Sequence, residues 1–163
     1  MKKNQLNFPN EISIYLADND EEDCLFFKEA LEELPLSSQL MSVNDGDELM
    51  QLLKDHLSSQ QEKKSKFPNV LFLDLNMPRK SGSECLSEIK SNNELKDIPI
   101  VIISSTLDRN AIDLLYDSGA NYFIRKPSDF FELKNFIHEA IINTYPKLKK
   151  ATKEEFILKT EKK

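Results

Sequence analysis

The sequence has 163 residues, a length that favours one domain and is sufficient for a single hydrophobic core. It carries 22 basic and 28 acidic residues, a net charge of −6. No apolar run approaches the roughly 18 residues that a membrane-spanning helix needs, and the polar N-terminal segment lacks the apolar core of a secretory signal. We therefore expect a cytoplasmic protein that does not interact with membranes.

The distribution of charge and of special residues excludes further classes. Residues 146–163 hold seven of the basic and three of the acidic residues, which leaves the rest of the chain with a net charge of −10. This acidic body should repel nucleic acid. Only three glycines occur, and they are isolated, so glycine-rich phosphate-binding loops are absent. The two cysteines lack the spacing of a zinc site.

Short apolar runs alternate with segments in which apolar residues recur at helical spacing. The nearly unbroken apolarity of the runs predicts strands that are buried on both faces, as in a parallel sheet, and the alternation predicts a three-layer, doubly wound α/β fold of five strands and five helices. We expect this domain over residues 12–145, between an N-terminal arm (1–11) and a basic tail (146–163). In chain order, strands at 12–17, 40–43, 70–73, 100–103 and 122–124 precede helices with apolar positions from Cys24 to Leu34, Leu49 to Leu57, Leu86 to Ile89, Ile112 to Leu115 and Leu133 to Ala140.

Each glycine follows or precedes one of these elements. Gly46 comes after the second strand, Gly82 comes before the third helix, and Gly119 comes after the fourth helix. Because glycine adopts positive φ at little cost, we expect such a backbone conformation at all three positions.

Polar side chains follow four of the five predicted strands. In an open parallel sheet, ligands bind beyond the carboxyl ends of the strands, so these side chains should meet at one edge. The first strand is followed by Asp18, Asn19 and Asp20, the third by Asp74 and Asn76, the fourth by Ser104 and Thr106, and the fifth by Lys126.

The chemistry of this group points to phosphoryl transfer. Oxygen ligands from two strands suit Mg²⁺, which keeps several waters and recruits phosphate oxygens. A carboxylate beside such an ion can attack a phosphorus centre, because the cation offsets the repulsion between anions. The lysine and the serine would then bind the remaining phosphoryl oxygens.

Four segments carry a family resemblance: YLADNDEED, LFLDLNMPRKSG, PIVIISST and GANYFIRKP. They resemble the successive motifs of the receiver domain of two-component response regulators, over roughly residues 12–145. Within that family the sequence is most similar to single-domain regulators, including those encoded beside bacterial phytochromes. The resemblance implies a flavodoxin-like fold with strand order 2-1-3-4-5.

The resemblance also assigns roles to individual residues. It implies that Asp74 accepts a phosphoryl group from a phosphohistidine on a sensor histidine kinase or a histidine phosphotransfer protein, with Mg²⁺ required. Asn19 departs from the family, which usually has a carboxylate there as a direct metal ligand, and an amide oxygen is a weaker ligand for Mg²⁺. Asp20 either compensates for this or caps the first helix. Asp18, Asn19, Asp74 and Asn76 (through its backbone carbonyl) would hold the metal, Ser104 and Lys126 would bind the phosphoryl group, Phe123 would be the aromatic switch, and Asp20 and Thr106 would be accessory.

The expected function is that of a stand-alone response regulator, read by a downstream protein partner on the face of the fourth helix, fifth strand and fifth helix. It would not be an enzyme beyond self-phosphorylation and autodephosphorylation. One alternative is a degenerate receiver that binds partners without phosphorylation, supported by Asn19. A haloacid-dehalogenase-type phosphatase is less favoured, because its second acid is replaced by Asn76.

Apolar side chains on that face predict an assembly. A large exposed apolar surface favours association, and a two-fold interface pairs the same patch with itself. We expect a homodimer whose C-terminal tail packs, through the triplet 156–158, on its own domain or on the partner's. The residues of the face are Ile112, Leu115, Tyr116, Phe123, Phe130 and Phe131, of which Ile112 and Leu115 could equally belong to the core.

Overall fold

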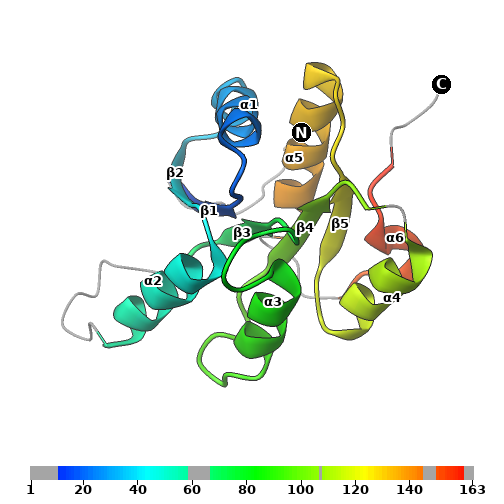
Figure 1. Ribbon diagram of the computed structural model, residues 1–163. Helices are drawn as coiled ribbons and strands as arrows, with labels where there is room; N and C mark the ends of the chain where they lie inside the picture. The colour runs from blue at the N-terminus through cyan, green and yellow to red at the C-terminus, as the bar shows by residue number, and fades with distance from the viewer. Residues whose placement is uncertain (1–10, 59–66, 107, 145–149, 160–163) are drawn as a thin grey trace, which may run out of the picture.

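The computed structural model describes residues 11–58, 67–106, 108–144 and 150–159. Strands and helices alternate along the domain, and a sixth short helix follows in the tail (Figure 1). The strands are β1 (Ile12–Ala17), β2 (Ser38–Val43), β3 (Val70–Leu73), β4 (Ile100–Ser104) and β5 (Tyr122–Arg125), and the helices are α1 (Glu21–Glu32), α2 (Gly46–Ser58), α3 (Gly82–Lys90), α4 (Arg109–Asp117), α5 (Phe130–Thr144) and α6 (Lys153–Phe156).

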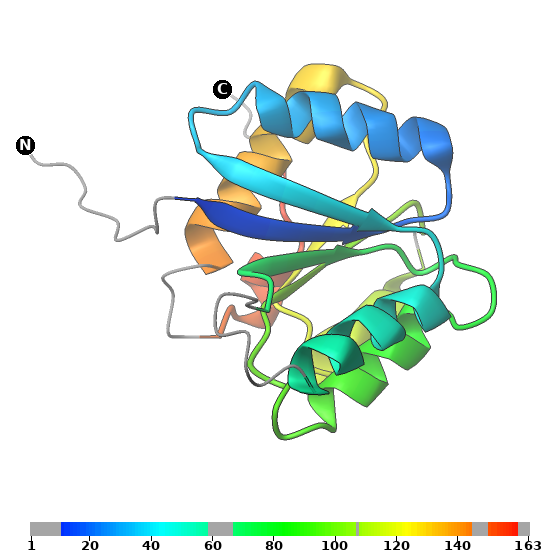
Figure 2. The same ribbon diagram turned by 90° about the vertical axis from the view of Figure 1, so that its left-hand side faces the viewer.

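The strands form one parallel sheet in the order β2-β1-β3-β4-β5. Helices α1 and α5 cover one face, and α2, α3 and α4 cover the other (Figures 1 and 2). Two apolar clusters fill the spaces between these layers, and the central strands β3 and β4 are buried along their whole length. The predicted three-layer fold and its strand order are confirmed.

The second strand begins earlier than the sequence predicted. It starts at Ser38 rather than at Leu40, because Ser38 and Gln39 pair in register with Ile12 and Ser13 of β1. β2 lies at the edge of the sheet, and its side chains are only partly covered. An edge strand tolerates polar residues, so apolar patterning does not mark where it begins.

The glycine prediction is confirmed at one position and wrong at two. Gly119 has a φ of 103°, whereas Gly46 and Gly82 do not adopt positive φ. These two are needed for space: a Cβ at Gly46 would lie 2.0 Å from the Lys80 carbonyl oxygen, and one at Gly82 would lie 2.2 Å from that of Asp74. The positive φ in this region falls on Arg79, at 69°.

The C-terminal tail packs against its own domain, as one of the two predicted arrangements requires. Helix α6, which the sequence analysis did not anticipate, begins with a capping box between Thr152 and Glu155. Its Phe156 is buried, with its ring centroid 5.3 Å from that of Tyr116 and 6.3 Å from that of Phe123. The chain then extends beside β5, where the Leu158 N–H donates to the Phe123 carbonyl at 2.9 Å.

This docking corrects the predicted apolar face. Ile112, Leu115 and Phe123 are buried, so Phe123 is not available as a surface residue. Tyr116 is partly buried, and its hydroxyl donates to the Ala151 carbonyl of the tail at 2.9 Å. Phe131 is 66% exposed. The homodimer itself stays a prediction.

Parts of the predicted N-terminal arm and C-terminal tail lie outside the described residues. All of the N-terminal arm except Glu11 lies outside the described residues, and so do residues 146–149 and 160–163 of the predicted tail. Among the described helices, none has the length and apolarity that crossing a membrane requires.

Candidate phosphoryl-acceptor site

Two buried carboxylates lie where adjacent strands end. Asp18 directly follows β1 and Asp74 directly follows β3, and both side chains are almost fully buried. Backbone hydrogen bonds extend the sheet as far as both residues, because the Asp18 N–H donates to the Val43 carbonyl at 3.1 Å and the Asp74 N–H to the Ala17 carbonyl at 2.9 Å. The ladder therefore sets the positions from which both carboxylates project.

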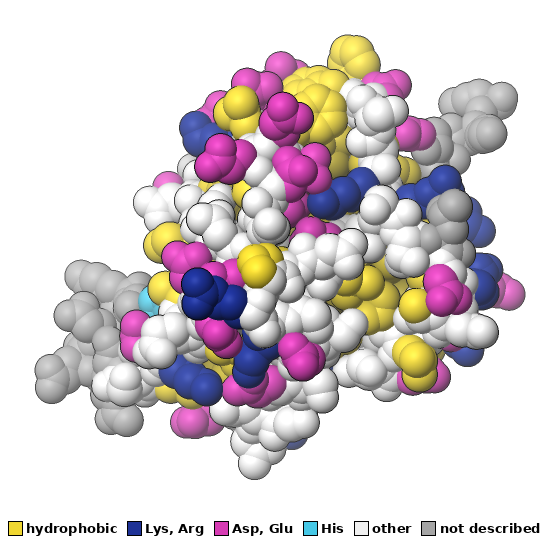
Figure 3. Space-filling view, in the orientation of Figure 1, with side chains coloured by type: hydrophobic (Ala, Val, Ile, Leu, Met, Phe, Trp, Pro, Cys, Tyr) yellow, Lys and Arg dark blue, Asp and Glu magenta, His cyan; other side chains and the backbone are white. Residues whose placement is uncertain are grey.

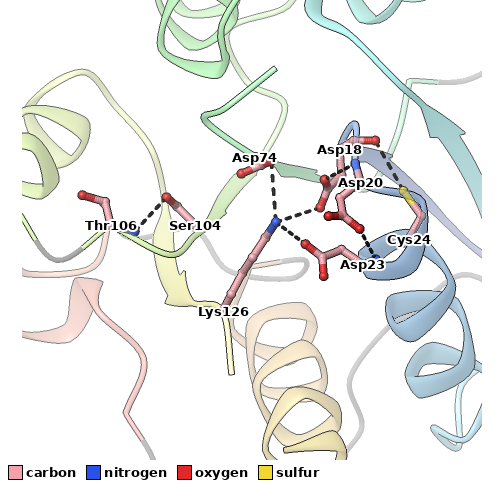
Figure 4. Close-up of polar contacts among 8 residues, drawn as sticks. All are labelled: Asp18, Asp20, Asp23, Cys24, Asp74, Ser104, Thr106 and Lys126. Atoms are coloured by element: carbon pink, nitrogen blue, oxygen red, sulfur yellow. Dashed lines mark hydrogen bonds and ion pairs between the residues drawn. The ribbon is translucent and has the colours of Figure 1, made fainter. Parts of the chain in front are cut away.

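Lys126 brings a positive charge to these carboxylates from the end of β5. The backbone N–H of Lys126 donates to the Ser104 carbonyl at 2.8 Å, and this hydrogen bond anchors the Lys126 backbone. Its ammonium nitrogen lies 3.2 Å from Asp18 Oδ2 and 3.6 Å from Asp74 Oδ2 (Figure 4). The predicted convergence of strand-end side chains is thus observed for Asp18, Asp74 and Lys126.

The electrostatics of the site follow from burying two acids beside one base. Burial, followed by the negative charge of Asp18, raises the pKa of the Asp74 carboxyl, while Lys126 and the backbone N–H of Asn76 oppose this. Burial lowers the pKa of Lys126, but hydrogen bonding to Asp23 and the charges of Asp18 and Asp74 outweigh it and raise that pKa. The site therefore retains excess negative charge that a bound cation would offset.

Ser104 and Thr106 occupy the end of β4. Ser104 is the last residue of the strand and is fully buried. Its Oγ accepts from the Thr106 N–H at 3.2 Å, and Figure 4 shows the hydroxyl turned toward that amide. Both residues lie at the predicted carboxyl edge of the sheet, and the Ser104 hydroxyl is bonded to the Thr106 amide.

In the loop after β1, Asp20 has the capping role that the sequence indicated as one of two possibilities. Asp20 is the N-cap of α1, and its Oδ1 accepts from the Asp23 N–H at 3.0 Å. The Asp20 N–H in turn donates to Asp18 Oδ1 at 3.0 Å. Asp20 therefore caps the helix and helps to orient Asp18, while its neighbour Asn19 is exposed at the same rim.

The oxygen ligands at this edge suit a divalent cation that also binds waters or phosphate oxygens. Among the described residues, no group of three or more His, Cys, Asp and Glu side chains is arranged to hold a metal by itself. Asp18 and Asp74 supply two buried carboxylates, and Asn19 and Asn76 are exposed beside them. Mg²⁺ accepts such a partial set, because it keeps waters and binds phosphate oxygens.

Two residues that the sequence pattern did not indicate also belong to this site, Asp23 and Cys24. Asp23, on the first turn of α1, lies 2.7 Å from the Lys126 ammonium nitrogen. The Cys24 Sγ donates to the Asp18 carbonyl at 3.4 Å, and burial, reinforced by Asp18, raises the pKa of its thiol to about 11. Asp23 comes three residues after the N-cap Asp20, a pattern that indicates the start of a helix. The pattern does not predict a contact with a distant residue such as Lys126.

Phe123, the predicted switch residue, packs against the tail. It lies on β5 three residues before Lys126, and its side chain is buried in the apolar cluster beneath α3 and α4. Its ring packs against Phe156 of α6. The predicted switch residue is therefore covered by this chain's own tail.

The fold and the site define a flavodoxin-like α/β protein with a buried pair of carboxylates and a lysine at the carboxyl edge of its sheet. The family model of the response regulator receiver domain matches residues 14–138, so the chain belongs to that family. This match confirms the resemblance that its sequence motifs indicated.

Relatives of known name support the same placement. Response regulator Rcp1 of Synechocystis sp. is 29% identical over 120 residues, which cover 74% of this chain and 80% of Rcp1. The probable methanogenesis regulatory protein FilR2 of Methanothrix harundinacea is 25% identical over 126 residues, covering 77% and 79% of the two chains.

Solved structures agree with the fold. The phosphorylated cyanobacterial phytochrome response regulator RcpA superimposes with a TM-score of 0.69 at 30% identity, covering 79% of this chain and 90% of that one. The Mn²⁺-bound form of Rcp1 superimposes with a TM-score of 0.71 at 25% identity, covering 86% of this chain and 99% of that one. The predicted similarity to stand-alone, phytochrome-associated regulators is confirmed.

Proposed function

We propose that this chain acts as a response regulator that accepts a phosphoryl group on Asp74 and signals by phosphorylation-dependent binding of a protein partner. The donor would be a phosphohistidine on a sensor histidine kinase or on a phosphotransfer protein. One observation carries the proposal: the buried Asp74 carboxylate lies next to both Asp18 and the Lys126 ammonium.

The chemistry is a displacement at phosphorus. A carboxylate oxygen of Asp74 attacks, the bond from phosphorus to the donor imidazole nitrogen breaks, and the imidazole leaves. Lys126 and the Ser104 hydroxyl bind phosphoryl oxygens, which stabilises the developing charge. Mg²⁺, held by Asp18, Asp74 and neighbouring oxygens, would neutralise charge between the two anions. Water attacking the acyl phosphate reverses the modification, which is autodephosphorylation.

Transmission would begin at Ser104. If its hydroxyl moves from the Thr106 amide to a phosphoryl oxygen, the packing around Phe123 changes, and Phe123 contacts Phe156 in the tail. A rearrangement at the phosphorylation site would thus reach the surface formed by α4, β5 and α6. This surface is where we propose that the downstream partner reads the phosphorylated state.

Intact-mass measurement tests the phosphoacceptor. The wild-type protein incubated with acetyl phosphate and Mg²⁺ should gain one phosphoryl group that alkali removes, because acyl phosphates hydrolyse readily. Asp74→Asn should gain none. An equal gain in this variant would refute the assignment of Asp74, and no gain in the wild type would favour the degenerate receiver that Asn19 suggests.

Asn19→Asp should strengthen Mg²⁺ binding. Replacing a neutral amide at this exposed rim with a carboxylate adds a charged oxygen ligand, so the Mg²⁺ concentration for half-maximal phosphorylation should fall roughly tenfold. Asn135→Asp, which makes the same charge change on the exposed surface of α5, is the matched control and should have little effect. Equal titrations for Asn19→Asp and the control would mean that residue 19 does not contribute a metal ligand.

A further inference from the structure

Within the described part of the chain, three carboxylates contact the Lys126 ammonium nitrogen, and that of Asp23 is the nearest. Its Oδ2 lies 2.7 Å from the nitrogen, against 3.2 Å for Asp18 and 3.6 Å for Asp74. Asp23 is also the outermost of the three, since its side chain is 41% exposed while those of Asp18 and Asp74 are buried. Figure 4 shows the lysine extended between Asp74 and the first turn of α1.

Both ends of the Asp23–Lys126 contact are fixed by the fold. On one side, the Asp23 N–H is bound by the Asp20 cap, so the first turn of α1 holds the carboxylate in place. On the other side, the Lys126 backbone is anchored to Ser104. The contact joins residues 103 positions apart in the sequence, and packing of α1 against α5 supports it.

The number of donors on the ammonium indicates what this contact does. A lysine ammonium has three N–H donors and no acceptor. With one donor committed to Asp23, two remain for Asp18 and Asp74, or for phosphoryl oxygens. Without Asp23, the remaining carboxylates in contact would be Asp18 and Asp74, which the proposed function needs for metal binding and for attack.

We propose that Asp23 is a positioning residue that engages the Lys126 ammonium from the rim of the site, so that Lys126 does not pair with Asp18 and Asp74 alone and keeps N–H donors for the incoming phosphoryl group. This proposal rests on the proposed function. Glu21 and Glu22 share the first turn of α1, where acidic side chains gather in Figure 3, but neither is bonded to Lys126 in the structure.

The first test observes the lysine without any phosphodonor. In proton–nitrogen spectra at low temperature, the Lys126 ammonium of the wild type should give a signal, because its hydrogen bonds slow exchange with water. Asp23→Asn should shift this signal, because the ammonium then keeps only the carboxylates of Asp18 and Asp74 as partners. Glu22→Gln, which removes the same charge from the neighbouring exposed position, should leave the signal at its wild-type position. A Lys126 signal that persists unchanged in Asp23→Asn would overturn the proposal.

The second test measures phosphorylation by acetyl phosphate across a Mg²⁺ titration. Asp23→Asn should lower the maximal rate roughly tenfold, the size of effect expected for loss of one charge-assisted hydrogen bond, and should raise the half-maximal Mg²⁺ concentration. Asp23→Glu should recover part of the rate, because it restores the charge. If Glu22→Gln matches Asp23→Asn, a loss of charge alone explains the effect and the positioning role is refuted.

The two tests separate this inference from the function on which it rests. If the wild type takes up no phosphoryl group, the proposed function fails, and the ammonium spectra still decide whether Asp23 holds Lys126. If the wild type is phosphorylated and the spectra of Asp23→Asn are unchanged, the function stands and the positioning role is refuted.

Discussion

Replacing Phe156 with alanine should lower the free energy of unfolding by about 3–5 kcal/mol, the usual cost of deleting a buried phenylalanine ring. The ring is 1% exposed and contacts both Tyr116 and Phe123. Its loss removes the main apolar contact between α6 and the domain. Phe123, which is buried partly because Phe156 covers it, would then face water.

Urea unfolding of the full chain measures this effect. Glu154→Ala is the matched control, because Glu154 is exposed on the same short helix and its replacement should change the free energy of unfolding by less than about 0.5 kcal/mol. A loss below about 1 kcal/mol for Phe156→Ala would show that the tail contributes little to stability. The docked tail would then not be a stable part of the fold in solution.

Gly82→Ala should damage both stability and phosphorylation. The new methyl group would lie 2.2 Å from the Asp74 carbonyl oxygen and 2.8 Å from the Leu75 Cα, and both of these are backbone atoms that no side-chain rotation can move away. The start of α3 must therefore shift away from the Asp74 loop, whose Leu75 carbonyl accepts from the Gly82 N–H at 3.0 Å. We expect a loss of about 2–3 kcal/mol in the free energy of unfolding.

The same shift should slow phosphorylation, because displacement of a reacting group by about 1 Å can cost a hundredfold in rate. Rates with acetyl phosphate and urea unfolding, measured on the same preparation, test both parts. Ser83→Ala changes the neighbouring exposed residue of α3 and should leave both quantities near the wild-type values. Wild-type stability and rate in Gly82→Ala would contradict the close approach of the two backbones.

The class of fold, the order of its elements and the residues at the strand ends could all be predicted from the amino-acid sequence. Buried parallel strands require nearly continuous apolar runs, and amphipathic helices require apolar residues at helical spacing, so both are visible in a local window of sequence. Asp18, Asp74, Ser104 and Lys126 could be placed at one edge because parallel strands end on the same side of a sheet.

The structure differs from the sequence-based predictions where segments that are distant in the chain meet. The apolar pattern did not mark the start of β2, because an edge strand has no second buried face. Gly46 and Gly82 leave room for the backbone of the β3–α3 loop, which passes close to both residues. This close approach is a property of the folded chain, so a rule about local turns does not predict it.

Two features of functional interest depend on contacts between distant parts of the chain. The contact between Asp23 and Lys126 depends on how α1 is oriented beside the end of β5, and the covering of Phe123 depends on where the tail returns to the domain. Local patterning specifies which face of an element is buried but not which distant residue meets it. Those pairings are selected by the packing of the whole chain, because only the folded domain brings such residues within contact distance.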